Sequence, residues 1–236
     1  MNILEIVLWA FFILTPLYVY FTHEKEKQNV IKQLVTRSKT YIYCIMFMLL
    51  PTLLLLFLVA QGHIPAKSIG LIWQPSITNL IAVFLIIVFI VYSILGLIKL
   101  RKDTSNDEKI IKSLHYVNWL MPRKPAELKL FVLGLSVSAG VCEELLFRGY
   151  LLNELMNFMP VYAAVILSSL MFGLPHLYQG PIHVLRTACM GAFLAILYLV
   201  CDSIYVPIVL HILFDMYGGF LAYLVLSRNK QQLATG

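Results

Sequence analysis

Long apolar runs alternate with short polar segments along the whole chain. A helix needs roughly 20 apolar residues to cross the hydrocarbon core of a bilayer, and the runs supply about that number. The pattern therefore predicts an all-α, polytopic transmembrane helical bundle with about seven spans, within a range of six to eight. The runs are 3–21, 40–61, 76–98, a long one within 127–157, 160–178, 183–201 and 204–226.

The composition agrees with a membrane protein and excludes an ordinary soluble domain. Hydrophobic residues make up 60% of the 236 residues, charged residues only 13%, and the mean hydropathy is +0.84. Charged residues make up about a quarter of a typical soluble domain. The sequence has no evident internal repeat, so we expect a single membrane domain over residues 1–236.

Positive charge is concentrated in two polar segments. Segment 22–39 holds five lysines and arginines and segment 99–129 holds eight, whereas segment 62–75 holds only Lys67. Cytoplasmic loops carry such an excess. We therefore attribute the net charge of +6 to topology and not to nucleic-acid binding. The expected protein is a multi-pass protein of the cell membrane, with its N-terminus outside and its C-terminus in the cytoplasm.

The second basic segment also contains an amphipathic pattern. In "DEKIIKSLHYVNWLMP" the apolar residues recur at roughly helical spacing. This spacing predicts an amphipathic helix that lies on the membrane surface and stops at Pro122.

Ionisable side chains inside the apolar runs cluster in the C-terminal half of the chain. Each costs at least about 2.5 kcal/mol at the centre of a bilayer, so a functional role is the first interpretation. In "EELLFR", Glu144 and Arg148 stand four residues apart on one helix face and can form an ion pair. Glu143 is turned about 100° away and lacks that partner, which makes it the candidate general base. The alternative is that all three form a salt-bridged cluster that only locks helix packing.

Two further motifs carry histidines. "FGLPHL" places His176 four residues after Phe172, and "HILFD" places His211 and Asp215 four apart on one face, as a metal-ligand pair or a hydrogen-bonded pair. A single histidine in a membrane helix more often joins two helices by a hydrogen bond. Together, a free glutamate, two histidines and an aspartate on three spans are the residues that water-activating hydrolysis requires. If they meet, the 160–178 helix must end inside the protein, in a water-accessible cavity.

The ordered motifs EExxxR, FxxxH and HxxxN/D resemble those of the CAAX prenyl protease and bacteriocin-processing (Abi) family of intramembrane endopeptidases. "EELLFRG", "FGLPH" and "HILFD" supply the three motifs in order. The resemblance covers roughly residues 121–226, which we expect to form the catalytic core. Residues 1–98 are similar to the family only in being hydrophobic, and we expect them to be variable N-terminal spans.

The resemblance implies hydrolysis of a peptide bond in a membrane-bound or amphipathic protein or peptide. Glu143 would be the catalytic base, and His176 would help to hold and activate water. His211 and Asp215 would contact the substrate carbonyl or a metal. The supporting positions of the motifs are Glu144, Arg148 and Phe172.

Asp215 departs from the asparagine that many relatives carry. An ionised aspartate can only accept hydrogen bonds, so Asp215 would have to be protonated to donate one to an oxyanion. The cofactor is left open between none and a divalent metal such as zinc, and we favour the metal-free scheme because of the asparagine in relatives. The possible metal ligands are Glu143, His176, His211 and Asp215.

Two rivals come from other functional classes. One is a catalytically silent bacteriocin-immunity or scaffold membrane protein, and the other is a transporter that uses the same side chains as a proton relay. The intact motifs favour the protease over the scaffold. The lack of a visible repeat in the two halves argues against the transporter.

Cysteine labelling tests the expected topology. In a variant without the native cysteines, single cysteines placed in segments 22–39, 62–75 and 99–129 are exposed to a membrane-impermeant thiol reagent on intact cells. Only the cysteine in 62–75 should react, because the two basic segments face the cytoplasm. All three should react once the membrane is permeabilised. Labelling of the two basic segments in intact cells would invert the orientation.

Overall fold

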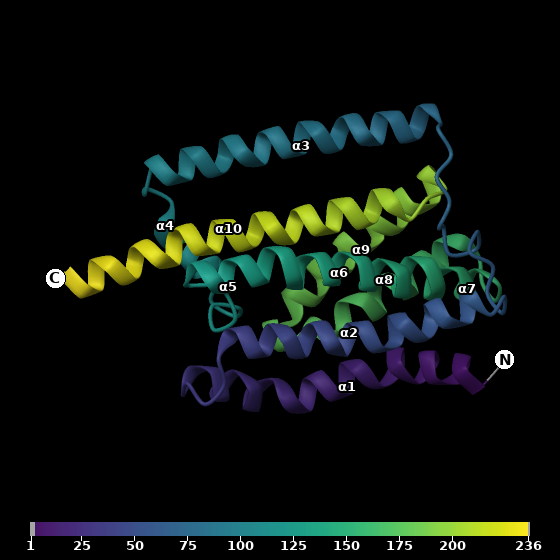
Figure 1. Ribbon diagram of the computed structural model, residues 1–236, viewed down its shortest axis with the longest axis horizontal. Coiled ribbons are helices and arrows are strands. Elements are labelled where there is room, and N and C mark those ends of the chain that lie inside the picture. Colours follow the sequence, from purple (N-terminus) through teal and green to yellow (C-terminus); the bar gives the residue numbers. More distant parts are fainter. Residues whose placement is uncertain (1–2, 236) are drawn as a thin grey trace.

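The computed structural model of the chain describes residues 3–235, with side chains through Arg228, and every regular element in this part is helical (Figure 1). Three short non-α segments, labelled η, interrupt the α-helices: two are π-helices (η1, η2) and one is a 3-10 helix (η3). The elements are α1 (Ile3–Ile31), α2 (Arg37–Ala60), α3 (Ile77–Lys102), α4 (Asp107–Ser113), α5 (Pro125–Leu130), η1 (Phe131–Leu135), α6 (Ser136–Glu144), η2 (Leu145–Leu152), α7 (Asn153–Met156), α8 (Val161–Gly173), η3 (Leu174–Gln179), α9 (Pro181–Cys201) and α10 (Tyr205–Thr235).

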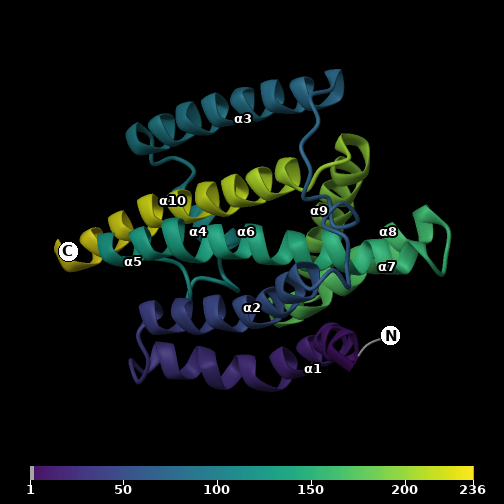
Figure 2. The ribbon, with the colours of Figure 1, turned by 45° about the vertical axis from the view of Figure 1, so that its right-hand side comes forward.

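Seven helices in the described part are long and apolar enough to cross a membrane, which confirms the predicted number of spans. The segment from α5 to α7, Pro125–Met156, is one continuous span, which we call the central span. Of its apolar window 56% is buried, against 11% for α3. The central span therefore forms the middle of the bundle, and α3 lies at its edge beside α10 (Figures 1 and 2).

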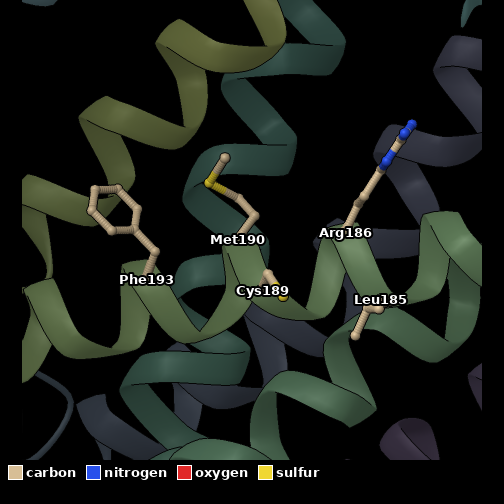
Figure 3. A pocket seen from close by; sticks show the side chains of 5 residues that line it. All are labelled: Leu185, Arg186, Cys189, Met190 and Phe193. Atoms are coloured by element: carbon tan, nitrogen blue, oxygen red, sulfur yellow. The ribbon is translucent and has the colours of Figure 1, made fainter.

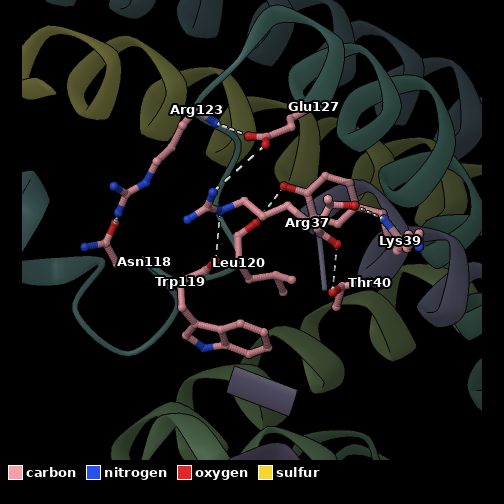
Figure 4. A network of polar contacts seen from close by, with 10 residues as sticks. Arg37, Lys39, Thr40, Asn118, Trp119, Leu120, Arg123 and Glu127 are labelled. Atoms are coloured by element: carbon pink, nitrogen blue, oxygen red, sulfur yellow. Dashed lines mark hydrogen bonds and ion pairs between the residues drawn. The ribbon is translucent and has the colours of Figure 1, made fainter. Parts of the chain in front are cut away.

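A helix is present where the surface helix was predicted, but it is shorter than its sequence pattern suggested. Only Asp107–Ser113 is α-helical, with no buried residue, and turns follow it. Side chains of α2 donate hydrogen bonds to backbone carbonyls of these turns. Arg37 Nε donates to the Trp119 carbonyl (2.9 Å), and the Tyr41 hydroxyl donates to the Leu120 carbonyl (2.6 Å). These contacts favour a turn over a continued helix (Figure 4).

A buried carboxylate ties the start of the central span to the start of α2 (Figure 4). Glu127 accepts a hydrogen bond from the Arg123 backbone N–H (2.8 Å) and lies 4.0 Å from the Arg37 guanidinium. Burial and the nearby positive charge of Arg37 lower the pKa of Arg123. The Arg123 guanidinium donates to Asn118 Oδ1 (2.9 Å), so the Glu127 carboxylate faces the guanidinium of Arg37.

At the opposite end of the bundle, the segment between α2 and α3 packs against η2. A Cβ on Gly149 would lie 3.2 Å from the Ile69 carbonyl oxygen, so any side chain here would push the Ile69 backbone away by a few tenths of an ångström. The Asn153 amide donates to the carbonyls of Arg148 (3.0 Å) and Gly149 (2.8 Å), which satisfies backbone acceptors of the π-helix. The connecting segment is thereby held on the central span.

The span that carries His176 changes its geometry before reaching that residue. The α-helix ends at Gly173, and the 3-10 turn η3, which contains Pro175, follows and packs against α1 and α9. A Cβ on Gly173 would lie 2.7 Å from the Val184 carbonyl oxygen, so the missing side chain lets α8 and α9 approach closely. The α-helical part of this span therefore ends before His176.

The contact at Gly149 generates a stability prediction. Gly149→Ala should lower the free energy of unfolding by about 1–3 kcal/mol, because the new methyl group would force the Ile69 backbone away. The measurement is thermal unfolding in detergent. Gly218→Ala is the control, since a Cβ there meets nothing within 4 Å, and alanine is the better helix former. Equal melting temperatures in the two variants would refute the close packing.

Candidate active site

One buried carboxylate oxygen joins two of the predicted motifs. Glu144 is fully buried, and its Oε1 accepts hydrogen bonds from Arg148 Nη1 and from His211 Nδ1, both at 2.7 Å. The ion pair expected from the four-residue spacing is confirmed. The contact with His211 was not predicted, because the two residues are 67 positions apart and no local spacing signals such a contact.

Arg148 extends this contact to two more helices. Its Nη2 donates to the Gly191 carbonyl of α9 (3.1 Å), and its guanidinium carbon lies 4.2 Å from the centroid of the Phe172 ring of α8. A carboxylate, a carbonyl and an aromatic face together compensate a cation that is withdrawn from water. The supporting position of Phe172 in its motif therefore has a physical explanation, namely that its ring covers a buried arginine.

The second ring nitrogen of His211 faces two carboxylates. Nε2 lies 3.8 Å from Glu143 Oε2 and 3.8 Å from Asp215 Oδ2. A carboxylate can only accept, so the Nδ1 contact with Glu144 means that Nδ1 carries a proton. Glu143 does not share Glu144's contact with Arg148, as expected, but it is not isolated, since His211 is its neighbour.

The two adjacent glutamates have different surroundings. The side chain of Glu143 is 22% exposed and that of Asp215 is 39% exposed, whereas that of Glu144 is 0% exposed. Glu144 is held by two hydrogen bonds on one oxygen. Glu143 and Asp215 are therefore accessible, whereas Glu144 contacts only buried partners, Arg148 and His211.

His176 approaches the cluster through an aromatic ring. The centroid of Phe172 lies 5.9 Å from that of His176 and 5.9 Å from that of His211, so Phe172 contacts both imidazoles. Among the described side chains, His176 Nδ1 is one of the buried polar atoms without a hydrogen-bond partner. The structure thus brings Glu143, His211 and Asp215 into direct proximity, and His176 joins them across Phe172.

The donor set was tested for a metal. Within residues 3–228, no group of three or more His, Cys, Asp or Glu side chains is arranged to hold a metal ion. His211 Nδ1 is engaged by Glu144, so only Nε2 of this ring faces Glu143 and Asp215. The steps proposed below use no metal.

Two surface hollows lie elsewhere on the bundle. One, of about 440 Å³, follows the outward face of α9 and is lined by Leu185, Arg186, Cys189, Met190 and Phe193 (Figure 3). The other, of about 290 Å³, has lining residues from α3, α10 and the segment that joins α3 to α4. Neither hollow is lined by a candidate catalytic residue.

Comparison with known proteins agrees with this arrangement. Residues 125–217 match the family model described as "Type II CAAX prenyl endopeptidase Rce1-like", while neither the curated proteins nor the solved structures gave a match. The matched segment begins with the central span and contains all the candidate catalytic residues, from Glu143 to Asp215. It leaves out α1, α2 and α3. Residues 125–217 of this chain are therefore similar to the Rce1-like family of type II CAAX prenyl endopeptidases.

Proposed function

We propose that the protein is an intramembrane endopeptidase in which Glu143 activates the attacking water. The family supports a CAAX-type membrane protease in general, acting on a membrane-associated protein. The observation that carries the finer proposal is the contrast between the two adjacent glutamates. Glu144 is buried and bonded to Arg148 and His211, whereas Glu143 is partly exposed beside His211.

The proposed reaction needs one proton acceptor and donors for the developing oxyanion. Glu143 takes a proton from water, the water oxygen attacks the peptide carbonyl, and the same proton passes to the leaving amine as the C–N bond breaks. We assign the second contact with the water to His176, whose ring lies beside Phe172 next to His211. His176 then holds the water while Glu143 deprotonates it.

His211 and Asp215 are placed to stabilise the negative charge on the carbonyl oxygen. Because Nδ1 of His211 donates to Glu144, its Nε2 can donate only when the ring is an imidazolium. Asp215 can donate only as a carboxylic acid. Donors of this kind are a large part of catalysis in acyl transfer, since removing one costs about 10²–10³ in kcat.

We also propose that the N-terminus lies outside the cell membrane and the C-terminus in the cytoplasm. The turn between α1 and α2, the short helix α4 and the end of α10 lie at one end of the bundle (Figures 1 and 2). Both basic segments of the sequence are thus at the same end, as a cytoplasmic location requires.

The experiment that tests the function is comparative membrane peptidomics. Membranes of cells that express the wild-type chain are compared with membranes of cells that express Glu143→Gln. Fragments that appear only with the wild type identify the cleaved bond and the substrate class. A fragment pattern identical in the two would favour a catalytically silent scaffold or immunity protein and overturn the proposal.

Substitution of the two glutamates should separate catalysis from stability. Glu143→Gln should abolish cleavage and leave the melting temperature in detergent nearly unchanged. Glu144→Gln should lower the free energy of unfolding by roughly 3–5 kcal/mol, because it leaves Arg148 buried without a countercharge, and it should also reduce activity by releasing His211.

Glu108→Gln is the matched control for Glu144→Gln. The Glu108–Lys112 pair has the same spacing and the same 2.7 Å distance as the Glu144–Arg148 pair, but its side chains are 81% and 75% exposed. Its loss should change the free energy of unfolding by at most about 1 kcal/mol. Full activity of Glu143→Gln would contradict the assignment of the base.

Asp215→Asn distinguishes the metal-free reaction from a metal-dependent one. The amide of asparagine donates a hydrogen bond, so the variant should retain or raise activity. The gain should be largest at alkaline pH, where a carboxylic acid ionises and stops donating. Activity is measured against pH, and zinc is measured in the purified protein. Stoichiometric zinc in the active wild type that is lost together with activity in Asp215→Asn would refute the metal-free reaction.

A further inference from the structure

A row of aromatic rings leads from α1 to the candidate catalytic histidine. The ring centroid of His23 on α1 lies 5.9 Å from that of Tyr178 on η3, at an interplanar angle of 35°. Tyr178 in turn stacks on His176, with centroids 6.5 Å apart and planes at 22°. An element that lies outside the family match thus reaches the active site through one tyrosine.

The His23 ring is itself fixed in orientation. Its Nδ1 lies 2.9 Å from the Tyr20 carbonyl oxygen and 3.2 Å from the Val19 carbonyl oxygen, both in the preceding turn of α1. A carbonyl can only accept, so Nδ1 carries the proton, and the ring plane follows from these bonds. The orientation of the His23 ring toward Tyr178 is therefore fixed by α1 itself.

The segment that carries His176 depends on neighbours for its position. η3 has six residues, and 3-10 turns have poorer hydrogen-bond geometry than α-helices and are used in short pieces. It ends at Gly180, whose φ of +99° breaks the helical path. On that side Tyr116 lies 3.9 Å from the position of a Gly180 Cβ. On the other side η3 is packed against α1, where His23 supplies the ring contact.

We propose that His23 and Tyr178 are positioning residues that hold the His176 imidazole against Phe172, so that α1 is part of the working active site. The inference rests on the proposed role of His176 in holding water. Any apolar helix would span the bilayer, so membrane insertion does not require His23 at this position in α1. Its ring contact with Tyr178 is explained if α1 supports His176. Neither residue touches the reacting atoms, and both act through His176.

Hydrogen exchange and kinetics test this proposal together. Backbone amide exchange over residues 172–184 is followed by mass spectrometry in detergent, and cleavage is followed with a farnesylated peptide that ends in a CAAX sequence. His23→Ala and Tyr178→Ala should speed exchange in this segment several-fold. They should also lower kcat roughly threefold to tenfold, the range expected for loss of one aromatic contact, with KM within about twofold.

Two conservative variants and one control make the result specific. Tyr178→Phe keeps a ring in place and should restore both exchange and kcat. His23→Phe also keeps a ring but loses the Nδ1 bonds to the carbonyls, so it should restore most of both. Phe21→Ala removes a ring of similar size from α1 where the side chain is 77% exposed, so it should leave both unchanged. Exchange in His23→Ala equal to that in Phe21→Ala, or failure of His23→Phe to restore it, would overturn the inference.

The exchange measurement also separates this inference from the proposed function. It reports the order of η3 whether or not the CAAX peptide is cleaved. If Glu143→Gln kept full activity while His23→Ala loosened residues 172–184, the catalytic proposal would fail and the support of η3 by α1 would stand. If exchange were unaffected while Glu143→Gln lost all activity, the reverse conclusion would follow.

Discussion

The rest of the site depends on the hydrogen bonds that the Glu144 carboxylate accepts from Arg148 and His211. One of its oxygens binds both Arg148 and His211, and Arg148 continues to the Gly191 carbonyl and the Phe172 ring. The central span, α8, α9 and α10 therefore meet around a single ion pair. In a bilayer no water can replace a lost partner, so these helices must keep this arrangement for both charges to remain compensated.

The same interaction prepares the neighbouring residues for chemistry. Because Glu144 fixes Nδ1 of His211, the other ring nitrogen is directed at Glu143 and Asp215. Support by a buried carboxylate sets both the orientation and the tautomer of a histidine, as it does in many catalytic sites. Adjacent positions in the sequence thus have separate tasks, one structural and one proposed to be catalytic.

Local geometry explains what could be predicted from the sequence. The spans follow from the length of apolar runs, and the Glu144–Arg148 pair follows from helical spacing, because both depend on residues close in the chain. The Glu144–His211 bond and the Arg148–Gly191 bond depend on how helices pack, so no spacing revealed them. The surface helix was predicted too long for the same reason, since α2 uses the carbonyls of the turns that follow it.

The π-helix η2 has a consequence for which sequence changes the central span can tolerate. A π turn contains about one residue more than an α turn, so side chains beyond it are rotated by roughly 100° relative to an uninterrupted α-helix. Deleting one residue between Leu145 and Leu152 would restore α geometry without breaking the helix. Because the π turn takes up one extra residue, this deletion would leave Asn153 facing Tyr198, whose hydroxyl lies 2.7 Å from its amide. Without the π turn, the same number of residues would rotate Asn153 by roughly 100° away from Tyr198. The π-helix is therefore what lets this span carry its extra residue and still keep the contact with α9.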